Sequence, residues 1–185
     1  AAGWRIEFTG LPARQGVVIV YPHTSNWDFP LGLMVKWALG FPVHFWGKDS
    51  LFKLPLFGRW MRWVGGVPVD RESPKGLVEQ MVERLKLARD RDEFFWLALA
   101  PEGTRSLGEH WRSGFYRVAL QAKAPLGLAY FDFDEKVIGL DRFIQLSGNQ
   151  EADMAVIAQY LGHRRGRKPE LATPIRLPPE KGATS

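Results

Sequence analysis

The chain reads VVIVYPHTSNWD from Val17 to Asp28, an apolar run followed by a proline and a polar turn. A short apolar run bounded by turn residues is typical of a buried strand in a sheet that helices cover. Two residues five positions apart would lie about 140° from each other around a helix, so His23 and Asp28 cannot share a helical face. We therefore expect His23 in the turn and Asp28 in the first turn of a helix that Ser25 or Asn26 caps.

The composition is that of one folded domain. The 185 residues, 45% of them hydrophobic, suffice for a sizeable core. We expect no signal peptide, and no apolar stretch reaches the ~18 residues that a membrane-spanning helix needs. The chain contains no cysteine, which excludes disulfides, thiolate metal sites and a cysteine nucleophile from it. Its four histidines show no metal-ligand spacing, so no metal site is expected.

Short apolar runs alternate with helical patterns along the chain. The candidate strands are residues 5–8, 17–21, 43–46, 67–69, 94–99, 126–131 and 137–140. Helices are expected after Asp28, after an N-cap at Ser73, and over residues 151–161, with a hairpin turn at 132–136. The alternation predicts a single-domain α/β fold with a roughly seven-stranded mixed, partly parallel sheet flanked by helices. We assign residues 1–162 to this domain and residues 163–185 to a basic, proline-rich C-terminal tail or surface strap.

Polar clusters follow four of the predicted strands. They are His23–Asp28, Gly47-Lys48, Asp70-Arg71 and Glu102–Arg105. Ligands of open α/β sheets bind outside the carboxyl ends of the strands, so these clusters are expected to converge on one crevice.

Four blocks of the sequence together resemble those of the glycerolipid acyltransferases, the family of 1-acylglycerol-3-phosphate acyltransferases. HTSNWD at 23–28 matches the H-x4-D signature of that family, and PEGTRS at 101–106 matches its third block. Between them, GKDSLFKLPLFG at 47–58 and GGVPVDR at 65–71 resemble the second block. The resemblance covers roughly residues 5 to 140.

The resemblance implies transfer of an acyl group from a thioester, on coenzyme A or acyl carrier protein, to a hydroxyl of a lipid acceptor, by default lysophosphatidic acid. No cofactor beyond that co-substrate is expected. His23 would be the general base and Asp28 its orienting carboxylate, and positioned base catalysis contributes roughly 10² to 10⁴ in rate. The implied substrate-binding residues are Lys48, Arg71 and Arg105 for anionic groups, Glu102 and Thr104 for the acceptor, and Gly103 for close backbone approach.

Two alternatives stay open beside this reading. The fourth block, at 125–130, lacks the second proline usual in the family, which favours a different alcohol acceptor, such as another lysolipid or a specialised lipid precursor. The second alternative is a non-catalytic lipid-binding domain of the same fold. The intact pair of His23 and Asp28 argues against it. A nucleic-acid-binding module would rest on the net charge of +5 alone, so no nucleic acid is expected as a partner.

Aromatic and basic residues are interleaved from Lys36 to Trp63, which holds four of the eight tryptophans. The stretch fits either ordinary core packing with cations at its edge or a surface that lies in a bilayer interface. We expect contact with a membrane surface, with the protein peripheral on the cytoplasmic face of the cell membrane. The oligomeric state is not predicted.

Overall fold

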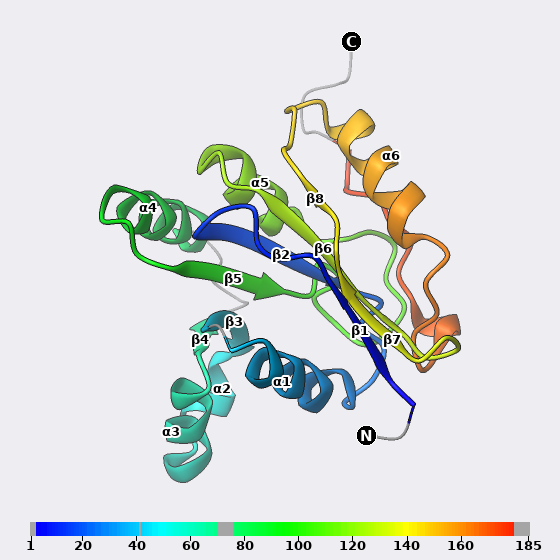
Figure 1. The fold of residues 1–185 in the computed structure, drawn as a ribbon, viewed down its shortest axis with the longest axis horizontal. Coiled ribbons are helices and arrows are strands. Elements are labelled where there is room, and N and C mark those ends of the chain that lie inside the picture. The colour runs from blue at the N-terminus through cyan, green and yellow to red at the C-terminus, as the bar shows by residue number, and fades with distance from the viewer. Residues whose placement is uncertain (1–2, 41, 70–75, 180–185) are drawn as a thin grey trace.

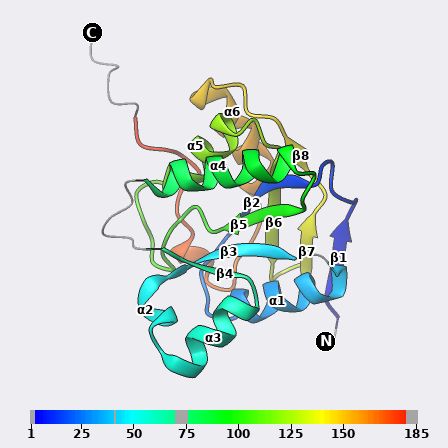
Figure 2. The same cartoon turned by 90° about the vertical axis from the view of Figure 1, so that its left-hand side faces the viewer.

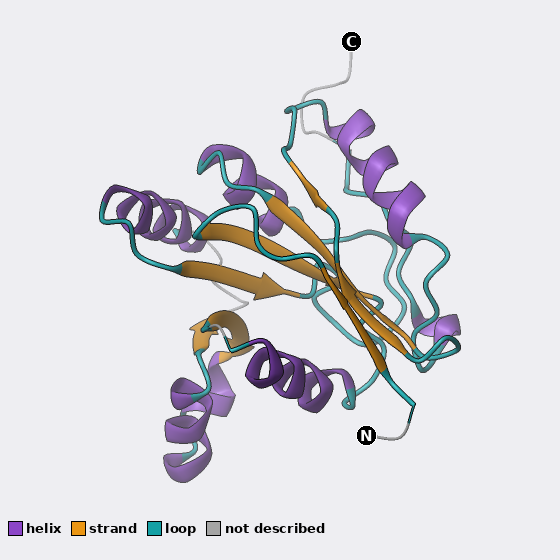
Figure 3. Ribbon diagram, in the orientation of Figure 1, coloured by secondary structure: helices purple, strands orange, loops and turns teal. Residues whose placement is uncertain are grey.

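The computed structural model describes residues 3–40, 42–69 and 76–179, and within them the chain forms one eight-stranded sheet (Figures 1 and 3). Its order is β1-β7-β6-β2-β5-β3-β4, and β8 also pairs with β6. Only the β6–β7 and β6–β8 pairs are antiparallel. The strands are β1 (Arg5–Phe8), β2 (Gln15–Tyr21), β3 (Val43–Lys48), β4 (Gly66–Val69), β5 (Phe95–Leu99), β6 (Leu126–Asp132), β7 (Val137–Leu140) and β8 (Phe143–Ile144).

Helices cover the sheet on both sides (Figures 1 and 2). On one side lie α4 (Leu77–Asp90), α5 (Gly114–Gln121) and α6 (Gln150–Leu161). On the other lie α1 (Asp28–Leu39), α2 (Asp49–Phe52) and α3 (Pro55–Trp63). This arrangement confirms the layered α/β architecture expected from the sequence. A parallel sheet requires helices on both sides, because they bury both of its faces.

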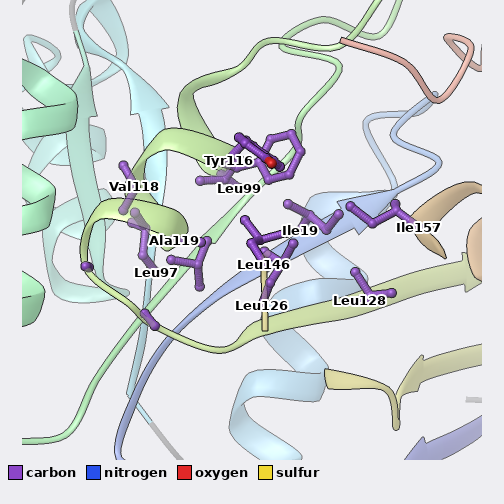
Figure 4. Packing of buried hydrophobic residues seen from close by; sticks show 14 of the residues in the cluster. Ile19, Leu97, Leu99, Tyr116, Val118, Ala119, Leu126, Leu128, Leu146 and Ile157 are labelled. Carbon is purple, nitrogen blue, oxygen red and sulfur yellow. The ribbon is translucent and has the colours of Figure 1, made fainter. Parts of the chain in front are cut away.

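The residues of β2 divide between the two faces of the sheet. Val17 and Ile19 are fully buried in the main core together with residues of α4, α5 and α6, part of which Figure 4 shows. Val18 and Val20 point the other way, into an apolar cavity below α1. Successive side chains of a strand point to opposite faces, so a run of four apolar residues is what a strand covered on both faces requires.

Most predicted elements are present, and the differences are local. The short strand β8 and the helices α2, α3 and α5 were not predicted. The prediction that Ser25 or Asn26 caps α1 is wrong: Trp27 is the N-cap residue without a side-chain cap, while Ser25 Oγ accepts a hydrogen bond from the Trp27 amide at 3.2 Å. The predicted N-cap Ser73 lies outside the described residues, and α4 follows Gly76, whose φ of 87° favours glycine.

After α6 the chain passes the loops that follow β2, β5 and β6 as a segment that we call the C-terminal strap, residues 163–177. It includes a 3₁₀ turn, Pro169–Leu171. The strap is bonded to three distant parts of the chain: the Phe133 amide donates to Arg165 O at 2.8 Å, the Lys168 amide to Thr24 Oγ1 at 3.2 Å, and the Trp111 amide to Arg176 O at 2.8 Å. Its residue Thr173 is completely buried, so this part of the strap is integrated into the fold.

Candidate active site

His23 and Glu102 come from loops that follow two neighbouring parallel strands, β2 and β5. Because both strands end at the same edge of the sheet, their loops meet there. The His23 amide donates a hydrogen bond to Glu102 Oε2 at 2.5 Å, although 79 positions separate the two residues. The sheet topology thus brings together the first and third motifs of the sequence.

Asp28 contacts the imidazole of His23. His23 Nδ1 lies 3.2 Å from Asp28 Oδ2, and the exposed fractions of the two side chains are 23% and 2%. The same Oδ2 accepts a hydrogen bond from the Ser25 amide at 2.9 Å, which fixes the carboxylate at the start of α1. A carboxylate at Nδ1 favours the tautomer with the proton on that nitrogen, so the lone pair is on Nε2 and can take a proton.

The second oxygen of Asp28 strengthens this pairing. Asp28 Oδ1 is buried without a hydrogen-bond partner among the residues that the structure describes. A buried carboxylate with few donors is poorly compensated, so the contact with His23 Nδ1 and the hydrogen bond from the Ser25 amide are what hold it in place.

Glu102 faces inward, toward backbone amides. Besides the bond from His23, its Oε1 accepts the Thr173 amide at 2.8 Å, and the side chain is buried. Burial raises the pKa of Glu102 above its usual value, and the hydrogen bonds from the Thr173 and His23 amides oppose that rise. Each carboxylate oxygen thus accepts a hydrogen bond from a backbone amide, and the side chain links the His23 loop to Thr173. The expected role of Glu102 in binding the acceptor stays a prediction.

The end of the third motif, residues 104–106, is exposed. Gly103 has a φ of 68°, and a Cβ there would come within 3.0 Å of Arg112 Cγ, so a side chain is disfavoured. Thr104 Oγ1 accepts a hydrogen bond from the Ser106 amide at 3.3 Å, and Arg105 is exposed. The expected contact of Arg105 with an anionic group stays a prediction.

The second motif is only partly described. The backbone of Lys48 ends β3, where it is in register with Val69 of β4. Arg71 lies outside the described residues. The expected roles of Lys48 and Arg71 therefore stay predictions.

An apolar cavity of about 240 Å³ opens beside the pair of His23 and Asp28, which we call the dyad. Its lining includes His23 and Asp28 and continues between α1 and the sheet, along Leu33 of the helix and Val20 and Phe131 of the strands. The sequence pattern did not predict this cavity. The sequence feature that could have indicated it is the apolar face of α1, but such a face is equally typical of a helix that packs tightly on a sheet.

The motifs of this site lie within a region that matches a known protein family. A sequence model of the acyltransferase family, described as "Acyltransferase", matches residues 5–127. The chain belongs to this acyltransferase family. The match contains both residues of the dyad and the third motif, and it ends before the C-terminal strap.

Curated relatives in the acyltransferase family carry one activity in their names. The 1-acyl-sn-glycerol-3-phosphate acyltransferase of Bacillus subtilis (strain 168) is 30% identical over 117 residues, which are 63% of this chain and 55% of that protein. Probable 1-acyl-sn-glycerol-3-phosphate acyltransferase 5 of Arabidopsis thaliana is 32% identical over 110 residues, 54% of this chain and 28% of that protein. The chain thus spans about half of the bacterial relative and less of the plant one.

Proposed function

We propose that this chain transfers an acyl group from an acyl thioester to a hydroxyl of a lysophospholipid, with 1-acylglycerol-3-phosphate as the acceptor. The observation that carries the proposal is the position of the His23–Asp28 dyad at the end of an apolar cavity. A cavity with apolar walls suits an acyl chain, and the dyad lies where the polar end of that chain would be. The names of the relatives support the choice of acceptor.

The proposed reaction needs only one proton carrier. His23 Nε2 accepts the proton of the acceptor hydroxyl while the hydroxyl oxygen forms a bond to the thioester carbonyl carbon. The carbon–sulfur bond then breaks, and the imidazolium returns the proton to the leaving thiolate. The products are an ester and a free thiol, and Asp28 stabilises the positive ring in between. The donor is a thioester of coenzyme A or acyl carrier protein, and exposed Arg105 would contact the acceptor phosphate.

The first test is turnover with defined substrates. Purified protein is incubated with a palmitoyl thioester and 1-acylglycerol-3-phosphate, and both thiol release and phosphatidic acid are measured. The proposal predicts one ester per thiol and no thiol release without the acceptor. Thiol release without any acceptor would contradict it, and turnover with another alcohol in an acceptor panel would replace 1-acylglycerol-3-phosphate as the substrate.

We further propose that α1, α2 and α3 form a membrane-contacting face. Among the described residues, nine of the thirteen exposed large apolar side chains belong to this region: Trp27, Met34, Trp37, Leu51, Leu54, Leu56, Phe57, Trp60 and Trp63. No described helix has the length and apolar character to cross a bilayer. Side chains of this kind on short helices suit insertion into the interface of one leaflet.

The helix α3 indicates which side of the membrane-contacting face would point to the bilayer. Leu56, Trp60 and Trp63 share one side of the helix by their spacing, whereas Gly58 and Met61 are buried on the opposite side. The exposed Arg59 and Arg62 flank the apolar side. This combination fits a bilayer with anionic lipids, since apolar groups insert while the guanidinium groups contact phosphates.

A further inference from the structure

Thr173 of the C-terminal strap has all of its polar groups bonded to the loops around the dyad. Its amide donates to Glu102 Oε1 at 2.8 Å, and its Oγ1 accepts the Gly108 amide at 3.1 Å. Its carbonyl accepts a hydrogen bond from Trp111 Nε1 at 3.3 Å. Since the residue is completely buried, these partners satisfy its polar groups in place of solvent.

Glu102 connects the strap to the dyad. One oxygen of this buried carboxylate holds the Thr173 amide and the other holds the His23 amide. The strap is therefore two hydrogen bonds from the backbone of His23. A buried carboxylate that loses one of its donors is costly, so the position of the His23 amide depends on the position of the strap.

A second attachment reaches the residue after His23. Thr24 Oγ1 accepts the Lys168 amide at 3.2 Å, and Gly166 lies directly over this loop. A Cβ at Gly166 would be 2.7 Å from Thr24 Oγ1 and 3.1 Å from Pro22 Cβ. The strap thus approaches the His23 loop more closely than any residue with a side chain allows. The guanidinium of Arg167 lies 5.4 Å from the centroid of the Trp27 ring, at the end of the same loop.

We propose that the C-terminal strap is part of the catalytic unit, in which Thr173 and Gly166 are positioning residues that act on His23 through Glu102 and Thr24. The inference rests on the proposed acyltransferase function. It goes beyond the family match, because the strap lies outside residues 5–127. It also gives Glu102 a role other than acceptor binding: this carboxylate sets the place of the base.

The kinetic test uses Glu102→Gln and Gly166→Ala, with Glu170→Gln as the matched control. Glu170 lies exposed in the strap, so its change to glutamine makes the same chemical substitution at a side chain that solvent reaches. An error of about 1 Å in a catalytic group lowers the rate by roughly 10²-fold, so we expect kcat to fall by about 10- to 100-fold in the first two variants. The KM for the acceptor should change by less than about 2-fold, because no acceptor contact is removed.

The spectroscopic test does not depend on turnover. In protein labelled with ¹⁵N at histidine only, the His23 amide proton should resonate far downfield, because it is bonded to a carboxylate at 2.5 Å. Glu102→Gln and Gly166→Ala should each move this signal upfield, and Glu170→Gln should leave it in place. Replacing Thr173 by valine removes the Oγ1 acceptor and gives a third variant if either of the others does not fold, whereas Thr173→Ser should retain the wild-type signal.

The outcomes separate the two proposals. A wild-type protein without turnover on any acceptor would end the proposed function, and the histidine amide signal would still test the strap. The inference would be overturned if the chemical shift of the His23 amide proton stayed unchanged in folded Glu102→Gln and Gly166→Ala proteins. A higher acceptor KM with unchanged kcat in Glu102→Gln would also overturn it, since that result makes Glu102 an acceptor ligand.

Discussion

Gly32 of α1 and Phe131 of β6 face each other across the apolar cavity, and a methyl group at Gly32 would come 3.8 Å from Phe131 Cζ. The absence of a side chain at this helical position therefore keeps the cavity open. We predict that Gly32→Leu shortens the preferred acyl chain by roughly two to four carbons, because the added side chain fills space of about that many methylenes. Turnover across a series of acyl thioesters of increasing length measures the shift.

Gly32→Ala is the matched control for this prediction. The single methyl group reaches only ordinary van der Waals contact, so chain preference should be retained. Alanine in place of glycine inside a helix should also stabilise the protein by about 0.5–1 kcal/mol. An unchanged chain preference in Gly32→Leu would show that the acyl chain does not enter this cavity.

The dyad should contribute strongly to the rate. We predict that His23→Ala lowers kcat by roughly 10² to 10⁴, the range of positioned general-base catalysis. Asp28→Asn should lower it as well, because the amide no longer selects the tautomer with the proton on Nδ1. Circular dichroism establishes that each variant is folded. Turnover in His23→Ala equal to that of the wild type would exclude His23 as the base.

The membrane-contacting face should respond to loss of its most exposed apolar groups. Leu56 and Trp63 are 83% and 76% exposed, and we predict that each change to alanine weakens binding to equimolar phosphatidylglycerol–phosphatidylcholine vesicles about 10-fold. Vesicle co-sedimentation measures the affinity. Val156→Ala, an exposed position on α6 across the sheet, is the control and should bind as the wild type does. Equal binding by Leu56→Ala, Trp63→Ala and the wild type would place the contact elsewhere.

His44 should make the fold less stable in mild acid. Burial lowers its pKa below the ordinary value, and the positive charges of Lys36 and Arg84 lower it further. Its ring stacks on Phe95 with 4.8 Å between centroids, and its Nδ1 is buried without a hydrogen-bond partner among the described residues. As the pH falls below about 6.5, the unfolded chain binds a proton that the folded chain excludes, so the free energy of unfolding decreases.

The slope from this one group can reach about 1.4 kcal/mol per pH unit. Urea unfolding of the wild type and His44→Phe between pH 7 and pH 5 measures it, and the variant should show the flatter profile. Replacement of exposed His163 by glutamine controls for a general loss of a histidine. Parallel profiles for the wild type and His44→Phe would contradict the prediction.

Local sequence pattern predicted the strands well because burial on both faces of a sheet leaves a local signature. The run from Val17 to Val20 alternates between the main core and the cavity, yet all four positions must be apolar. The hairpin at 132–136 was predicted for a similar reason, since a charged turn separates two apolar runs that pair as β6 and β7. Helix α5 was missed because its apolar residues continue directly into the turn before β6.

The candidate site was predictable in its motifs and not in its contacts. The order of the blocks around His23 and Glu102 pointed to one crevice, and the structure brings these two residues into a direct hydrogen bond. That the carboxylate of Glu102 faces Thr173 could not be read from spacing, since 71 positions separate them. The strap carries few apolar residues, so its sequence resembles a solvent-exposed tail.

The sequence by itself determined the alternation of strands and helices and the residues available for chemistry, because periodicity and side-chain type are local properties. Tertiary structure alone decided which backbone amides bond to the carboxylate of Glu102 and where the apolar cavity lies. It also decided that Thr173 is buried beside the loops of the site. Those outcomes depend on desolvation and on hydrogen bonds between distant segments, whose free energies are defined only once the chain has closed around them.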